Sequence, residues 1–127
     1  MDEARVLVVD DNPTNLKLAC DVLEWSGFNV LSAADAEEAL KVIELSPPDV
    51  ILMDIALPGM DGLTLTRQLK ASAATRDIRV VALTAFAMKG DEQKAIEAGC
   101  DGYISKPIDT RMLGAEIARY LREKSEL

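Results

Sequence analysis

The sequence predicts an α/β fold: a doubly wound, five-stranded parallel sheet with strand order 2-1-3-4-5 and five helices. Short apolar runs alternate five times with longer segments of helical periodicity, and short connections join them. The third run is apolar on successive residues, as expected for a strand buried on both faces. Right-handed βαβ units of this kind place helices on both faces of one sheet. The expected strands lie at 5–9, 28–32, 49–53, 79–83 and 102–105.

The first two helices are marked by residues that favour helix ends. Asn12 followed by Pro13 is typical of an N-cap with proline in the first turn, and Gly27 is typical of a helix end. Asp35 and Glu38 have the spacing of a capping box. Both signals come directly after an expected strand, so each predicts a strand that turns at once into a helix.

The other three helices have fewer residues that mark their ends. A Ser-Pro-Pro run at 46–48 breaks the chain before the third strand, and Asp61 caps the helix that follows that strand. A fourth helix covers roughly 89–98, and a fifth begins at about Asp109. The fourth helix has a thin apolar face, for which we expect Ala95, Ile96 and Ala98. A helix with so little apolar surface is expected to be held only weakly.

Composition excludes several classes of function. The net charge of −8 argues against nucleic acid or an anionic membrane surface as the main partner. No apolar run approaches the length needed to span a bilayer, and the N-terminus lacks the layout of a signal peptide, so we expect a cytoplasmic protein. The chain has no histidine, which excludes Ser-His-Asp and Cys-His catalysis. Cys20 and Cys100 form no C-x-x-C pair and are expected to be reduced.

Three aspartates follow strands that should be neighbours. Asp10 and Asp11 end the first strand, and Asp54 ends the third. In sheets of this order, ligands bind beyond the carboxyl ends of the strands where the order reverses, here between strands one and three. Three carboxylates in one cleft repel each other, and a hard divalent cation such as Mg²⁺ would compensate them. The alternative is three solvated loop acids, since single aspartates after strands are common.

Two further polar residues end strands at the same edge. Thr84 ends the fourth strand and Lys106 ends the fifth. Each has an ordinary explanation on its own, because threonine is common in strands and lysine is common on surfaces. Together with the acids they supply a nucleophile, a metal site and donors for anionic oxygens. These are the parts that a phosphoryl-transfer site requires.

Five ordered segments carry a resemblance to a known family. They are the runs VLVVDDN ending at Asn12, ILMDI around Asp54, LPGMDG from Leu57, ALTA around Thr84, and GYISKP ending at Pro107. The sequence resembles the receiver domain of two-component response regulators, with the CheY-like fold. The resemblance covers the whole chain and implies a single domain over residues 1–127 with no output domain. It looks most like the DivK-type single-domain response regulators.

The resemblance implies a role for each site residue. Asp54 would be the phosphoacceptor, and Thr84 and Lys106 would bind the phosphoryl oxygens. Asp11 would bind Mg²⁺, or Mn²⁺ in its place, directly, and Asp10 would do so mainly through water. The backbone carbonyl of Ala56 and the Asp54 carboxylate would complete the metal ligands.

The resemblance also implies a switch and partners. Tyr103 would turn inward when Thr84 moves toward the phosphate, and the Lys106–Pro107 peptide bond would be cis. The phosphoryl group would come from a sensor histidine kinase or a histidine phosphotransfer protein, and a downstream protein target would read it. Phe86 and Met88 either pack beneath the fourth helix or belong to the partner surface, and both interpretations stay open.

The positions two after Asp54 and two after Thr84 hold Ala56 and Phe86. Neither side chain can orient an attacking water, so we expect slow self-dephosphorylation. The chain would then be a phosphoacceptor signalling domain and no enzyme in its own right.

Two other classes compete with this interpretation. A small Mg²⁺-dependent aspartyl phosphatase of haloacid-dehalogenase type would need its nucleophile on the first strand and a second Asp two positions later. A flavodoxin-like electron carrier would need a loop rich in glycine and hydroxyl groups after strand one. The chain has adjacent acids, Asp10 and Asp11, in that place. Both alternatives therefore fit the sequence poorly.

Overall fold

The computed structural model of the chain describes residues 4–57, 59–84, 89–106 and 108–125. In this part of the chain five parallel strands form one sheet in the order β2-β1-β3-β4-β5, as predicted. The strands are β1 (Arg5–Val9), β2 (Asn29–Ala33), β3 (Val50–Asp54), β4 (Arg79–Thr84) and β5 (Gly102–Ser105). The helices are α1 (Pro13–Trp25), α2 (Ala36–Leu45), α3 (Gly62–Ala71), α4 (Lys89–Ala98) and α5 (Leu113–Ser125).

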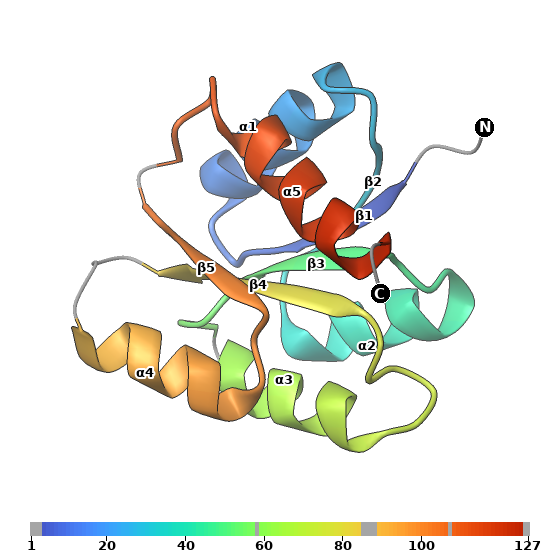
Figure 1. The fold of residues 1–127 in the computed structure, drawn as a ribbon, viewed down its shortest axis with the longest axis vertical. Coiled ribbons are helices and arrows are strands. Elements are labelled where there is room, and N and C mark those ends of the chain that lie inside the picture. Colours follow the sequence, from blue (N-terminus) through green and yellow to red (C-terminus); the bar gives the residue numbers. More distant parts are fainter. Residues whose placement is uncertain (1–3, 58, 85–88, 107, 126–127) are drawn as a thin grey trace.

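Helices cover both faces of the sheet. Figure 1 shows α1 and α5 on one side and α2, α3 and α4 on the other. Alternate residues of the central strands therefore enter two separate cores. Leu7 and Ile51 pack with α2 and α3, whereas Val8 and Leu52 pack with α1 and α5. All residues of β3 are buried, which confirms the expectation for a strand covered on both faces.

The predicted caps form. The Asn12 side chain accepts hydrogen bonds from the backbone N–H groups of Thr14 and Asn15 at 3.0 and 3.1 Å. Asp35 accepts from the Glu38 N–H at 2.8 Å, but Glu38 reaches back to the Ala34 N–H at 3.4 Å and not to Asp35 itself. The capping box is therefore offset by one residue on its return side.

Two expectations need correction. Ile96 is 59% exposed, so the buried apolar face of α4 in the described residues consists of Ala95 and Ala98 alone. The fifth helix begins at Leu113 and not at about Asp109. The Asp109 carbonyl accepts from the N–H groups of both Met112 and Leu113 at 3.0 Å, and this tight turn precedes the regular helix.

No helix in the described ranges has both the length and the apolar character needed to cross a membrane. The strand boundaries differ from the expected ones by a single residue in β2, β3 and β4. The extra residue at the end of β3 is Asp54 and the extra residue at the end of β4 is Thr84. Both predicted site residues are therefore held by the sheet itself.

Replacing Leu52 by Ala tests how far stability depends on the doubly covered sheet. Leu52 is fully buried between β1 and β4, so the substitution leaves a cavity and should lower the free energy of unfolding by about 2–5 kcal/mol. Urea unfolding followed by circular dichroism measures this loss. Leu45→Ala is the matched control, because Leu45 is 84% exposed and should change stability by less than about 0.5 kcal/mol.

Candidate functional site

Three carboxylates meet at the carboxyl edge of the sheet. One oxygen from each of Asp10, Asp11 and Asp54 lies within 4.8 Å of the others. Asp10 and Asp54 are only 1% and 3% exposed, whereas Asp11 is exposed to solvent. The structure thus brings together the three acids that the strand ends predicted.

Backbone geometry explains why they meet. Val9 of β1 pairs with Met53 of β3, so the next residues, Asp10 and Asp54, lie opposite each other. Each carboxylate is then oriented by a hydrogen bond from the backbone N–H of the residue two positions later in the chain. The Asn12 N–H donates to Asp10 Oδ1, and the Ala56 N–H donates to Asp54 Oδ1, both at 2.9 Å. The second oxygen of each acid is left to face the cleft.

Lys106 supplies positive charge to this cleft. Its Nζ donates to Asp54 Oδ2 at 3.1 Å and lies 3.5 Å from Asp10 Oδ2. Its backbone N–H donates to the carbonyl of Thr84 at 2.7 Å, which fixes the start of the Lys106 loop against the end of β4. One ammonium group therefore spans the two buried acids.

Charge and burial shift the ionisation of two groups. Burial raises the pKa of Asp10, and the negative charge of Asp54 raises it further, against the Asn12 N–H and Lys106, which lower it. For Lys106, burial acts to lower the pKa, but the hydrogen bond and the charge of Asp54, together with Asp10, outweigh it and raise the pKa. The cleft thus holds more negative charge than its one lysine compensates.

The cluster of carboxylate oxygens fits a hard divalent cation. Asp10 Oδ2 is buried, and no hydrogen-bond donor reaches it within the described residues. A buried carboxylate oxygen without a hydrogen bond is rare in proteins, and Lys106 Nζ at 3.5 Å compensates its charge only in part, which leaves room for a cation. Carboxylate oxygens such as those of these three acids are ligands that Mg²⁺ prefers.

Thr84 and Tyr103 lie on neighbouring strands but in different environments. Thr84 is the last residue of β4 and is 1% exposed, beside the Asp54 end of β3. Tyr103 of β5 is 38% exposed and borders a surface hollow of about 250 Å³ together with Leu113 and Glu116. The structure therefore places Thr84 inside the sheet edge and Tyr103 at the surface.

Three expectations concern residues outside the described part of the chain. Phe86 and Met88, expected either as packing residues or as partner surface, lie outside the described residues. Pro107, expected to follow a cis peptide bond, lies outside them too. Their predicted roles stay predictions. Ala56, by contrast, is described and exposed, and its backbone N–H donates to Asp54 Oδ1.

Sequence reasoning missed the contribution of Gly62. A Cβ atom built on Gly62 would lie 2.3 Å from the Asp54 carbonyl oxygen and 2.9 Å from Ile55 Cα. Only glycine lets the first turn of α3 approach the end of β3 so closely. The one available signal was a glycine directly after the N-cap Asp61, where glycine is a poor helix residue.

This fold and this cluster of acids with one lysine define a class of protein, the receiver domains of two-component signalling. The chain belongs to the response regulator receiver domain family, which matches residues 6–118. Membership implies interaction with histidine kinases or phosphotransfer proteins. It gives no support to the haloacid-dehalogenase-type alternative.

Individual relatives agree with this assignment. The polar-differentiation response regulator DivK of Brucella ovis is 45% identical over 116 residues, which cover 91% of this chain and 94% of that protein. A putative response regulator from Chloroflexus aurantiacus superposes with a TM-score of 0.91 at 31% identity, over 95% of this chain and 99% of the other. A CheY-like receiver domain protein from Methanospirillum hungatei gives 0.89 at 31% identity, with 98% of each chain covered.

Replacing Asp10 by Asn should stabilise the metal-free protein at neutral pH by about 0.5–2 kcal/mol, because it removes a buried charge that Asp54 repels. A carboxyl whose pKa is raised by folding weakens the fold above that raised pKa and ceases to do so below the unfolded value of 3.8. The advantage of the variant should therefore shrink as the pH falls toward 4.

Urea unfolding in the presence of a chelator, repeated between pH 4 and 8, measures this advantage. Asp21→Asn on the exposed side of α1 is the control and should show no such pH-dependent gain. A stability loss in Asp10→Asn at pH 7 would contradict the electrostatic account of the cleft.

Proposed function

We propose that the chain accepts a phosphoryl group on Asp54 from a phosphohistidine of a partner protein, in a Mg²⁺-dependent reaction. The observation that carries the proposal is the contact between Lys106 Nζ and Asp54 Oδ2 at 3.1 Å, within a cluster of three carboxylates. Of the two buried acids, Asp54 lies nearer to Lys106, at 3.1 Å against 3.5 Å for Asp10. It also ends a buried strand, which holds a nucleophile rigidly.

The chemistry follows from the groups present. An Asp54 carboxylate oxygen attacks phosphorus, the P–N bond of the phosphohistidine breaks, and the imidazole departs with its bonding electrons and takes up a proton. Lys106 donates to the oxygens of the transferred group, while the Ala56 N–H keeps the other Asp54 oxygen in place. Asp10, Asp11, Asp54 and the Ala56 carbonyl would hold Mg²⁺, which supplies positive charge to the phosphoryl oxygens.

The proposed response to phosphorylation runs through β4 and β5. The buried Thr84 hydroxyl would turn toward the phosphoryl oxygens, and Tyr103 would move from the surface into the space behind it. This biases an existing balance between two arrangements of the α4 surface, and the protein signals through the target that binds one of them. With a net charge of −8, we infer that this target is a protein and not nucleic acid or membrane.

Asp54→Asn should abolish phosphorylation completely, because an amide cannot replace the carboxylate nucleophile. Incubation with an acyl phosphate and Mg²⁺, followed by intact-protein mass spectrometry, measures the modified fraction. Asp77→Asn is the matched control, since Asp77 is an exposed acid on the connection between α3 and β4 and should be modified at the wild-type rate. Modification of Asp54→Asn at the wild-type level would place the phosphoacceptor elsewhere.

The phosphorylated state should be long-lived, because the Ala56 methyl group cannot orient an attacking water. Loss of radiolabelled phosphate from the purified protein measures the lifetime, and decay within seconds would reject the idea. Ala56→Asn places an amide at that exposed position while it keeps the backbone carbonyl. It should accelerate the decay by up to about 100-fold, at the low end of what a positioned polar group contributes.

A further inference from the structure

Charged residues stand at the starts of four strands, at the sheet edge opposite the site. Each lies five positions before a site residue: Arg5 before Asp10, Asp49 before Asp54, Arg79 before Thr84, and Asp101 before Lys106. A polar residue at each end of a short apolar run marks where the strand enters and leaves the apolar core. The two aspartates among these residues, Asp49 and Asp101, also make hydrogen bonds to the backbone of a neighbouring strand.

Asp49 links the start of β3 to the start of β1. Its backbone N–H donates to the Arg5 carbonyl at 2.8 Å, and its carboxylate accepts from the Arg5 N–H, also at 2.8 Å. Its own carbonyl accepts from the Arg79 N–H of β4 at 3.2 Å. One residue thus joins the starts of three adjacent strands.

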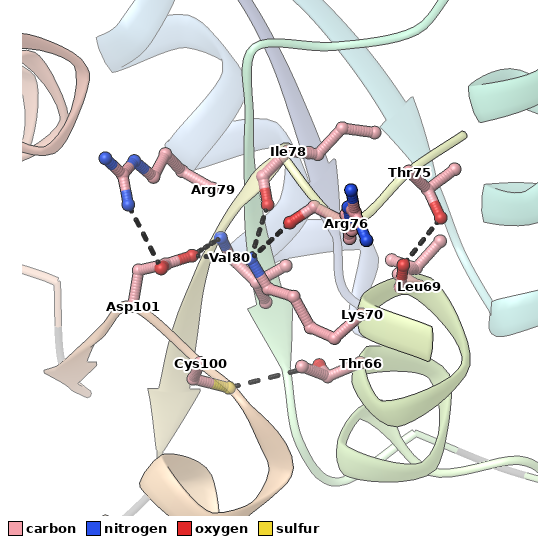
Figure 2. Close-up of polar contacts among 10 residues, drawn as sticks. All are labelled: Thr66, Leu69, Lys70, Thr75, Arg76, Ile78, Arg79, Val80, Cys100 and Asp101. Carbon is pink, nitrogen blue, oxygen red and sulfur yellow. Dashed lines mark hydrogen bonds and ion pairs between the residues drawn. The ribbon is translucent and has the colours of Figure 1, made fainter. Parts of the chain in front are cut away.

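Asp101 repeats this pattern between β5 and β4. Its backbone N–H donates to the Val80 carbonyl at 2.7 Å, and its carboxylate accepts from the Val80 N–H at 2.8 Å. Figure 2 shows that Arg79 and Lys70 converge on the same carboxylate, at 3.3 and 3.0 Å. Lys70 Nζ also donates to the carbonyl of Ile78 at 2.8 Å, so α3 is tied to the same point.

The strands themselves give little information about their alignment. Register is normally specified by alternation, because a shift by one residue moves every apolar side chain to the wrong face. In β1 and β3 this protection is missing, because four successive residues of β1 and all of β3 are buried. β5 has only four residues, lies at the edge of the sheet, and buries Ile104 alone. Something other than the apolar pattern must therefore align these strands.

We propose that Asp49 and Asp101 are positioning residues that set the register of β3 against β1 and of β5 against β4. Asp49 thereby brings Asp54 beside Asp10, and Asp101 brings Lys106 beside Thr84. The structural part of this inference stands alone, and its consequence for phosphorylation rests on the function proposed above. Neither aspartate touches the reacting groups, since each lies a whole strand away from them.

The size of the effect follows from strand geometry. One residue of a parallel strand spans about 3.3 Å, so even a single-residue slip would break the 3.1 Å contact between Lys106 and Asp54. Smaller displacements also matter, because a misplacement of about 1 Å in a reacting site can lower a rate about 100-fold.

The test uses Asp49→Ala, Asp101→Ala and the matching Asn variants in the full chain. Asn keeps a carbonyl oxygen that can accept the Arg5 or Val80 N–H, so it should rescue what Ala removes. Asp35→Ala is the matched control, because it removes a helix-capping carboxylate without touching the sheet. Two readouts are needed: cross-strand NOEs between Val6 and Val50 and between Val81 and Gly102, and the Asp54 phosphorylation rate at saturating acyl phosphate and Mg²⁺.

We expect the Ala variants to lose or weaken the cross-strand NOEs of their own strand pair and to react about 10- to 100-fold more slowly. The Asn variants should recover most of both, and Asp35→Ala should keep both. Native NOEs and a native rate in both Ala variants would overturn the proposal. If the wild type itself is not phosphorylated, the proposed function fails, and the NOEs alone still decide the register claim.

A measurement on the wild type covers the case in which an Ala variant does not fold. The Arg5 and Val80 amides should exchange with deuterium as slowly as the ladder amides of Val8 and Leu83. Exchange of both at the rate of unprotected amides would show that the two carboxylates do not hold these strands, and would overturn the proposal.

Discussion

The pairing of Lys106 with two buried aspartates is the interaction on which the site depends. Two carboxylates that are almost completely buried would otherwise repel each other at close range in a poorly solvated place. A single ammonium at 3.1 and 3.5 Å compensates part of that charge and leaves the rest unbalanced. The residual negative charge fits a divalent cation, whose preferred ligands are oxygens of this kind.

The apolar core of the parallel sheet offsets the unfavourable free energy of this concentration of charge. Its central strands are apolar on both faces, so their burial stabilises the fold while their carboxyl ends converge at one edge. Gly62 then allows α3 to close directly against the Asp54 carbonyl. The middle residues of these strands therefore form the apolar core, and the residues at their carboxyl ends bring the repelling carboxylates together.

Much of this site could be predicted because each of its residues ends an apolar run. Asp10, Asp54 and Lys106 follow such runs directly, and the strand order brings the ends of these strands to one edge of the sheet. What escaped prediction depends on contacts between segments distant in the sequence. The close approach at Gly62 and the exposure of Ile96 on α4 are decided by how helices seat on the sheet, which no local pattern encodes.

The two kinds of aspartate in this chain differ in how fully their oxygens are satisfied. The Asp101 carboxylate accepts from one backbone N–H and from two cationic side chains, so its charge is compensated by groups of β4 and α3. Asp10 keeps a buried oxygen that no donor in the described residues reaches. A satisfied carboxylate gains nothing further from a ligand, whereas an unsatisfied one gains a great deal. The hydrogen-bond partners therefore separate Asp101, whose carboxylate is held by donors from β4 and α3, from Asp10, which keeps one oxygen available to a cation.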